Sequence, residues 1–144
     1  MKNKILILAG DPISINSEII YKSWKKLSAK EKKNLIVIGN YNLLYKQFKK
    51  LKYKIKIKHL NDIDKIEDKF SLKIINVPLK FKNPFKIPYK YNSKYVIKCL
   101  NLAHKIAMSN PIKGIINCPI DKRLLKKTGN FGVTEFLASK CKIL

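Results

Sequence analysis

The segment "KILILAGDPISINSEII", residues 4–20, decides the class of fold. Its first six residues are almost wholly apolar, which is typical of a β-strand covered on both faces. A turn of glycine, aspartate and proline follows, and we expect Ser14 or Asn16 to cap a helix that runs to about Lys26. A buried strand that leads through a turn into a helix predicts an α/β unit with a mainly parallel sheet.

The same alternation continues along the rest of the chain. Further strands are predicted at residues 34–38, 53–58, 72–77 and 114–118, and helices at 41–51, from Asn92 or Ser93 to about Met108, at 121–127 and from Thr134 onward. A polar connector is expected at residues 61–69 and a proline-containing loop at 78–88. No linker divides the sequence, so we expect a single α/β unit over residues 1–144, with helices flanking a mainly parallel sheet.

The charge of the chain is strongly positive, with 32 basic residues, 9 acidic residues and a formal net charge of +23. Every basic residue except Arg123 is a lysine, and the lysines are spread over the whole length. Proteins that bind bases or phosphates specifically rely on the planar guanidinium of arginine. The composition therefore indicates lysines on solvated faces. We expect no specific nucleic-acid partner, although a basic surface attracts polyanions without selectivity.

The sequence predicts neither a membrane span nor an export signal. No apolar run approaches the roughly 18–20 residues of a membrane span, and the apolar stretch at residues 5–9 is shorter than the about 7–15 residues of a signal peptide. We therefore expect a cytoplasmic protein without a membrane partner. In that compartment Cys99, Cys118 and Cys141 are expected to be buried free thiols.

The common cofactor and metal motifs are missing from the sequence. There is no GxxxxGK[ST] motif, and the turn after the first strand is not GxGxxG. His59 and His104 have no partner at metal-ligand spacing, so no metal site is assigned. Ligands of parallel α/β sheets bind beyond the carboxyl ends of the strands. Residues 10–18 and 118–122 are expected to lie there.

Three segments, taken in order, resemble one enzyme family. They are LAGDPISINSEII (residues 8–20), INCPIDKRLLKKTG (residues 116–129) and FGVTEFLASK (residues 131–140). The corresponding features of the 4-hydroxythreonine-4-phosphate dehydrogenase family are a GDPxGIGPE turn, a PxxK turn and a GHTEFLA segment. The chain resembles this family of pyridoxal phosphate biosynthesis from residue 4 to its C-terminus, most weakly over residues 45–90.

The resemblance implies a fold, a reaction and a set of cofactors. The family fold is related to that of the isocitrate and isopropylmalate dehydrogenases. It is a two-domain α/β enzyme that works as a homodimer with its active site in a cleft. The family oxidises a phosphorylated hydroxy-amino acid with NAD or NADP. A divalent metal holds the amino and hydroxyl groups of this small-molecule substrate and stabilises the charge that develops as hydride leaves.

Four residues take the family's substrate-binding positions by resemblance. Thr134 matches the threonine of GHTEFLA, Lys122 the lysine of the PxxK turn, and Asp11 the aspartate of the first turn. Val133 stands where the family has histidine, and a valine side chain has neither a hydrogen-bond donor nor an acceptor. Without the resemblance, Thr134 is expected to cap a helix, Asp11 to fix its turn, and Lys122 to be a solvated surface residue.

Family members are much longer than this chain, and their metal-binding histidines and much of their cofactor site follow the GHTEFLA segment. The resemblance therefore implies that residues 1–144 are a truncated, N-terminal part of a longer two-domain enzyme, inactive alone. No catalytic, cofactor-binding or metal-binding residue is assigned in it. Two alternatives stay open. One is a relative that acts on another phosphorylated hydroxy acid, which Val133 favours, and the other is a non-catalytic basic α/β module that binds anions or nucleic acid.

Overall fold

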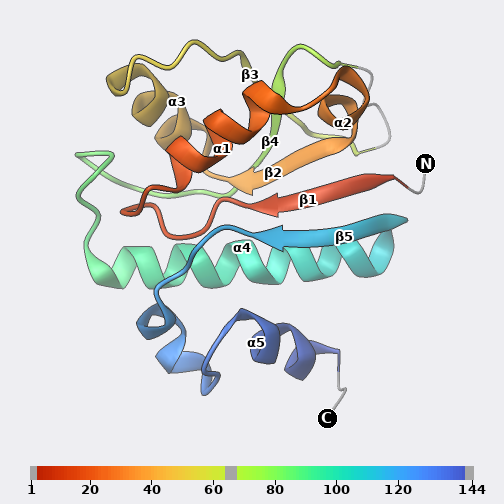
Figure 1. Ribbon diagram of the computed structural model, residues 1–144. Coiled ribbons are helices and arrows are strands. Elements are labelled where there is room, and N and C mark those ends of the chain that lie inside the picture. Colours follow the sequence, from red (N-terminus) through yellow and green to blue (C-terminus); the bar gives the residue numbers. More distant parts are fainter. Residues whose placement is uncertain (1–2, 64–67, 142–144) are drawn as a thin grey trace.

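A computed structural model describes residues 3–63 and 68–141 of the chain. Within these residues one sheet of five strands is flanked by helices (Figure 1). The strands are β1 Lys4–Leu8, β2 Leu35–Gly39, β3 Ile57–His59, β4 Leu72–Asn76 and β5 Ile112–Asn117. The helices are α1 Asn16–Lys26, α2 Ala29–Asn34, α3 Tyr41–Lys50, α4 Tyr89–Ser109, the short 3-10 helix η1 Lys122–Thr128, and α5 Val133–Lys140.

The strands lie in the order β3-β4-β2-β1-β5, and every neighbouring pair is parallel. The predicted α/β class with a mainly parallel sheet is confirmed. The order places β2 in the middle of the sheet and β5 at one edge, beside β1. Because all strands run the same way, their carboxyl ends meet at one end of the sheet, where the arrowheads of β1, β2 and β5 lie in Figure 1. Ligands of such sheets bind at this end.

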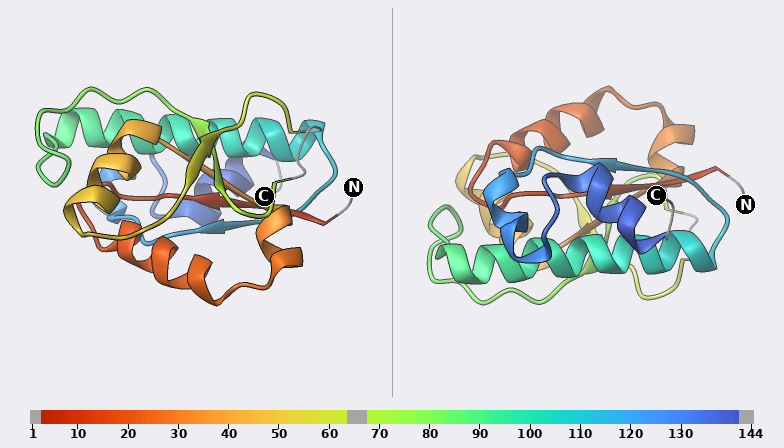
Figure 2. Two further views of the ribbon diagram at one scale, coloured as in Figure 1. Left: turned by 90° about the horizontal axis from the view of Figure 1, so that it is seen from above. Right: turned by 90° about the horizontal axis from the view of Figure 1, so that it is seen from below.

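Two layers of helices cover the two faces of the sheet. Figure 2 shows α4 on one side of the strands and α1 on the other. Alternate residues of β2 point to opposite faces. Ile36 and Ile38 join the core beneath α4, whereas Leu35 and Val37 join the core beneath α1 and α3. Residues 34–38 were predicted as a strand, and these four side chains are all buried, as expected for a central strand of a parallel sheet.

Helix α4 begins earlier than the sequence predicts. It starts at Tyr89 behind Pro88, not at a cap of Asn92 or Ser93. Pro88 is the N-cap residue, and its ψ of 138° lies outside the helical range, so the helix begins at the next residue. Asn92 and Ser93 lie inside the helix and are buried. Their side chains bond to other parts of the chain and do not cap α4. The hydroxyl of Ser93 donates to the carbonyl oxygen of Leu124 at 2.6 Å.

Helix α1 also lacks the predicted side-chain cap. Its N-cap residue is Ile15, which makes no side-chain capping bond. The hydroxyl oxygen of Ser14 accepts from the backbone N–H of Asn16 at 3.2 Å, and Asn16 itself is the first residue of the helix. The side-chain amide of Asn16 is instead used in a contact with a distant turn, described below.

Two further segments differ from the expected boundaries. Residues 53–58 alternate in exposure as predicted, but strand pairing begins only at Ile57. Helix α2 was not predicted, although its N-terminus has a capping box in which Ser28 and Glu31 bond reciprocally. Residues 64–67 of the expected connector lie outside the described residues. No helix in the described part of the chain combines the length and apolar character that a membrane span requires.

One lysine of the sheet is buried. Lys73 of β4 exposes 1% of its surface, and its ammonium nitrogen donates to three carbonyl oxygens. Two belong to Lys32 and Lys33 at the end of α2, at 2.6 and 3.1 Å, and the third to Asp68, at 2.9 Å. Burial lowers the pKa of Lys73 to about 8. The side chain thus joins β4, α2 and the loop before β4 at the amino end of the sheet.

Candidate functional site

The turns after β1 and β5 are bonded to each other at the carboxyl end of the sheet. The side-chain amide of Asn16 donates to the carbonyl oxygen of Pro119 at 2.7 Å, and the N–H of Asp11 donates to the same oxygen at 3.2 Å. Gly10 has a left-handed backbone with φ of 74°, and a Cβ there would lie 2.5 Å from the Asn16 amide nitrogen. The packing of these two turns therefore requires glycine at position 10.

A cavity of about 280 Å³ opens next to these turns, between β5, η1 and α5, and is called the η1–α5 cavity below. It brings together Lys122, Val133 and Thr134, which are three of the four residues singled out in the sequence. The complete lining is Asn117, Ile120, Lys122, Leu125, Phe131, Gly132, Val133, Thr134 and Glu135. Residues from the PxxK turn and from the GVTEFLA segment thus line one cavity.

The N-terminus of α5 faces this cavity without a side-chain cap. Its N-cap residue is Gly132, so the prediction that Thr134 caps the helix is wrong. Glycine has no side chain to accept from the first-turn amides, which leaves partial positive charge at the helix end. Lys122 adds a full positive charge, while Thr134 contributes a hydroxyl and Glu135 a carboxylate. The cavity can therefore receive an anionic group together with a hydroxyl or an amine.

Val133 has a structural contact in this arrangement. It is half-buried and packs against the core beneath α4. An imidazole at this position could bond to a ligand, whereas the valine offers only apolar surface. The donors and acceptors of the cavity consequently come from the residues around Val133.

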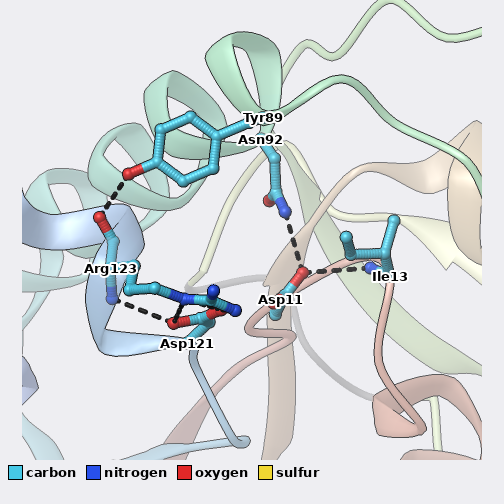
Figure 3. Close-up of polar contacts among 6 residues, drawn as sticks. All are labelled: Asp11, Ile13, Tyr89, Asn92, Asp121 and Arg123. Carbon is cyan, nitrogen blue, oxygen red and sulfur yellow. Dashed lines mark hydrogen bonds and ion pairs between the residues drawn. The ribbon is translucent and has the colours of Figure 1, made fainter.

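Asp11 lies in a second cavity, on the other side of η1. This Asp11 cavity measures about 350 Å³ and is lined by Asp11, Ile13, Tyr89, Asn92, Asp121, Arg123, Leu124 and Lys126. Figure 3 shows the polar contacts there. Oδ1 of Asp11 accepts from the backbone N–H of Ile13 at 3.1 Å and from the side-chain amide of Asn92 at 2.9 Å. The first bond is the predicted turn contact, and the second joins the turn to α4.

The opposite wall of the Asp11 cavity is an ion pair. The Arg123 guanidinium donates from Nε at 3.0 Å and from Nη2 at 2.6 Å to the Asp121 carboxylate. These bonds hold the pKa of Asp121 below its usual range, and the same pairing raises the pKa of Arg123. The hydroxyl of Tyr89 donates to the carbonyl oxygen of Arg123. Helix η1 thus separates the two cavities, with Lys122 on one side and Arg123 on the other.

The cysteines differ from the prediction at one position. Cys99 and Cys118 are buried, and burial raises the pKa of their thiols to about 12 and about 11. Cys141 is exposed, because it ends α5 at the surface, and its sulfur lies 3.4 Å from Nε2 of His104. Sequence reasoning missed this pair, and no local signal could have found it, since the two residues are 37 positions apart.

The donor set of the described residues does not fit a catalytic metal. No group of three or more His, Cys, Asp or Glu side chains in residues 3–63 and 68–141 is arranged to hold one. The turn after β1 does not fit a dinucleotide phosphate of the Rossmann kind either. In that site the backbone glycines are open to the pyrophosphate, whereas the space at Gly10 is filled by Asn16 and Pro119.

The chain matches a family model of known proteins. Residues 31–143 match the family model described as "Pyridoxal phosphate biosynthetic protein PdxA". The chain belongs to this family. The matched range includes the PxxK turn and the GVTEFLA segment, whereas the turn at Asp11 lies before it. The resemblance stated from the three sequence segments is confirmed.

Curated relatives of the PdxA family match the chain almost throughout. A protein of Aquifex aeolicus named 4-hydroxythreonine-4-phosphate dehydrogenase is 31% identical over 140 residues, which cover 96% of this chain and 42% of the relative. One of the same name from Erythrobacter litoralis is 28% identical over 141 residues, with 95% and 42% covered. A Fusobacterium nucleatum protein, provisionally named D-threonate 4-phosphate dehydrogenase, is 29% identical over 150 residues, with 95% and 43% covered.

Solved structures share the fold. The 4-hydroxythreonine-4-phosphate dehydrogenase of Burkholderia phymatum superposes with a TM-score of 0.81 at 23% identity, covering 95% of this chain and 43% of that one. The enzyme of Klebsiella pneumoniae gives a TM-score of 0.77 at 22% identity, covering 95% and 44%. The chain therefore has the fold found in PdxA proteins and spans less than half of the length of these relatives.

Proposed function

We propose that this PdxA-family chain contributes part of the substrate site of a dehydrogenase that oxidises 4-hydroxythreonine-4-phosphate in pyridoxal phosphate biosynthesis. Relatives that carry this name support the proposal, as does the η1–α5 cavity. We further propose that NAD or NADP, a divalent metal and a homodimer belong to the whole enzyme. The chain spans 42% of those relatives, so we place its role in an incomplete α/β unit of a longer two-domain protein, without activity of its own.

The observation that carries the proposal is the convergence of Lys122, Thr134 and the uncapped N-terminus of α5 on one cavity. A phosphate is attracted both by the ammonium of Lys122 and by the positive end of the helix. The hydroxyl of Thr134 and the carboxylate of Glu135 can bond to the hydroxyl and amino groups of the same substrate. The roles of Lys122, Thr134 and Val133 in substrate binding remain our proposal, and Asp11 is placed in the neighbouring cavity.

Because of Val133, binding of a second phosphorylated substrate should be tested in the same way. The Fusobacterium nucleatum relative carries the name of a D-threonate 4-phosphate dehydrogenase, whose substrate has a hydroxyl where the hydroxythreonine has an amine. Valine offers no donor or acceptor to either group. Val133 therefore does not distinguish the amine from the hydroxyl. The alternative substrate is another phosphorylated hydroxy acid of the same size.

The experiment is a calorimetric titration of the chain with 4-hydroxythreonine-4-phosphate and with D-threonate 4-phosphate. The Lys122→Gln variant should bind about tenfold more weakly, because a charge-assisted bond to phosphate is lost. The matched control is Lys127→Gln, since Lys127 is exposed on the same helix and lines neither cavity. Equal losses in both variants would contradict the proposal.

The non-catalytic alternative gives a different pattern in the same variants. A basic module would bind DNA of any sequence, with an affinity that falls steeply as salt is added. Lys122→Gln and Lys127→Gln would then weaken DNA binding equally, and neither phosphorylated substrate would bind. That combination would replace the proposed function.

A further inference from the structure

A thiol and an imidazole meet at the C-terminal end of α5. The sulfur of Cys141 lies 3.4 Å from Nε2 of His104, which is part of α4. Cys141 is exposed and His104 is half-buried. Helix α5 packs against α4 through Phe136, which shares a core with Leu100 and Ala103. The pair is therefore held by two packed helices and can be reached from solvent.

The separation of these two atoms suits a shared metal ion. Thiolate sulfur and imidazole nitrogen are both metal ligands, and Nε2 is one of the two imidazole atoms that bind metals. A tetrahedral ion about 2.3 Å from a sulfur and about 2.0 Å from a nitrogen holds these atoms about 3.5 Å apart. The observed separation is 3.4 Å. The fold thus already places the two ligands at the spacing that one ion requires.

A further sulfur donor lies one turn along α4. Met108 follows His104 by four residues, so the two side chains are neighbours on the same face of the helix. Met108 exposes 69% of its surface, so its thioether is not used in the core. A methionine side chain has three rotatable bonds and a polarisable sulfur. Two sulfurs and one imidazole nitrogen can therefore surround a single ion.

This set of donors favours Cu(I) over zinc. Zinc sites in proteins use three or four Cys, His or carboxylate ligands, and no such group occurs among residues 3–63 and 68–141. Thiolate and thioether sulfurs select soft ions such as Cu(I). The formal net charge of +23 also disfavours a divalent ion more than a monovalent one, because repulsion grows with the charge of the ion.

We propose that Cys141 and His104 bind one Cu(I) ion, with Met108 as a third ligand. The thiol releases its proton to solvent as the copper–sulfur bond forms, and the copper stays in the same oxidation state. The buried thiols of Cys99 and Cys118 lie outside the site. The site is at the opposite end of α5 from the η1–α5 cavity. It is separate from the divalent metal of the proposed function, to which no residue of the chain is assigned.

The test is an anaerobic titration of the chain with Cu(I), in which a chromophoric chelator competes for the ion and gives the affinity. The chain has two histidines, so nuclear magnetic resonance follows both imidazoles separately. The signals of His104 should shift and saturate at one Cu(I) per chain. The signals of His59 should stay unchanged, since this residue lies on β3 and is stacked on Tyr41.

Three variants measure the contribution of each ligand. Cys141→Ser should weaken Cu(I) binding at least about 100-fold, because even the loss of a residue that only supports a ligand costs roughly 10–100-fold. His104→Gln should weaken it at least about tenfold. Met108→Leu keeps the size of the side chain but removes the sulfur, and should weaken it about threefold. The matched control, His59→Gln, should leave the affinity unchanged. Urea denaturation of each variant checks that the fold is retained.

Several outcomes would overturn the proposal. They are an affinity that Cys141→Ser leaves unchanged, equal shifts of both imidazoles, and a chelator that retains all of the Cu(I). Tighter binding of Zn(II) than of Cu(I) would show that the choice of metal is wrong, and an unchanged affinity in Met108→Leu would remove the third ligand. Lys122→Gln should not alter Cu(I) binding, so failure of this proposal and failure of the proposed function are distinguishable.

Discussion

Strands β2 and β5 both contain several isoleucines, yet they have opposite surroundings. All five residues of β2 are buried in the middle of the sheet. No residue of β5 is fully buried, and Ile116 exposes 53% of its surface at the edge. Both cavities at the carboxyl end lie next to the segments that follow β5. The buried core of the sheet thus lies around β2, whereas both candidate sites lie beside the exposed edge strand β5 and the segments that follow it.

Removal of the same side chain from both strands should have very different effects on stability. Ile36→Ala in β2 should cost about 3 kcal/mol of unfolding free energy, because it leaves a cavity at a residue with 0% exposure. Ile116→Ala in β5 should cost about 0.5 kcal/mol or less. Urea denaturation measures both values. Similar losses at the two positions would mean that β5 is covered as fully as β2.

Gly10 and Gly129 both have a left-handed backbone with φ of 74°, but the space around them differs. Gly10→Ala should cost about 2 kcal/mol or more, because the added Cβ meets Asn16 and the backbone of Pro119 at 2.5 and 2.7 Å in addition to the strained φ. Gly129→Ala, after η1, meets nothing within 4 Å and should cost only about 1 kcal/mol. Thermal denaturation of the two variants gives the difference. If Gly129→Ala were the more damaging change, the open packing of that turn would be disproved.

Buried titratable groups predict a pH dependence of stability with two opposing parts. The pKa of Lys73 is about 8 in the fold against 10.5 when unfolded, so between these values the unfolded chain binds more protons and stability rises with pH. The pKa values of Cys99 and Cys118, about 12 and about 11 against 9.0, make the folded chain bind more protons above pH 9. Each thiol then lowers stability by about 1.4 kcal/mol per pH unit.

Stability should therefore rise from pH 8 to 9 and fall above pH 9, where two thiols outweigh one amine. Urea denaturation under reducing conditions measures the curve. In the Cys99→Ala, Cys118→Ala double variant the fall between pH 9 and 10.5 should be replaced by a rise, and Lys73→Met should lose the rise between pH 8 and 9. A double variant that still loses stability over the upper interval would argue against the buried state of the thiols.

The smallest expected effects compare the N-terminus of α2, which has a side-chain cap, with that of α5, which has none. Ser28→Ala should cost about 1 kcal/mol, since the Ser28 hydroxyl accepts from the N–H of Glu31 and completes the capping box of α2. Thr134→Ala should cost less than about 0.5 kcal/mol, because Thr134 is exposed and α5 has no side-chain cap. Denaturation curves decide between them. A loss of about 1 kcal/mol in Thr134→Ala would show that the Thr134 side chain caps α5. The N-terminus of α5 would then not be available to a ligand in the η1–α5 cavity.

The elements of the fold were largely predictable, because strands and helices follow local patterns. The apolar runs of β1 and β2 and the alternation at residues 53–58 gave their approximate places. The start of α4 at Tyr89 was predictable from Pro88, and α2 from the spacing of Ser28 and Glu31, since both signals are local. The exposure of β5 was not, because it depends on where α4 returns the chain to the sheet.

The candidate site likewise has one part that the sequence predicts and another that it does not. Lys122 and Thr134 are 12 positions apart and could be placed together by the family motifs. Asp11 was expected beside them, whereas η1 lies between the two cavities. The bond that fixes Asp11 comes from Asn92, 81 positions away, and a polar residue at the start of a predicted helix was interpreted as a cap. Contacts between residues so far apart in the sequence are set by the packing of the whole chain, so the local sequence does not predict them.

The three carbonyl bonds of Lys73 have a consequence for the chemistry of its amine. Every basic residue of the chain except Arg123 is a lysine, so an acylating reagent meets many free amines on the surface. Lys73 is shielded from such a reagent while its nitrogen is held at the end of α2. Acylation there requires that α2 first separates from β4. The rate at which the peptide carrying Lys73 gains the label, followed by mass spectrometry, therefore measures how often this end of the native molecule opens.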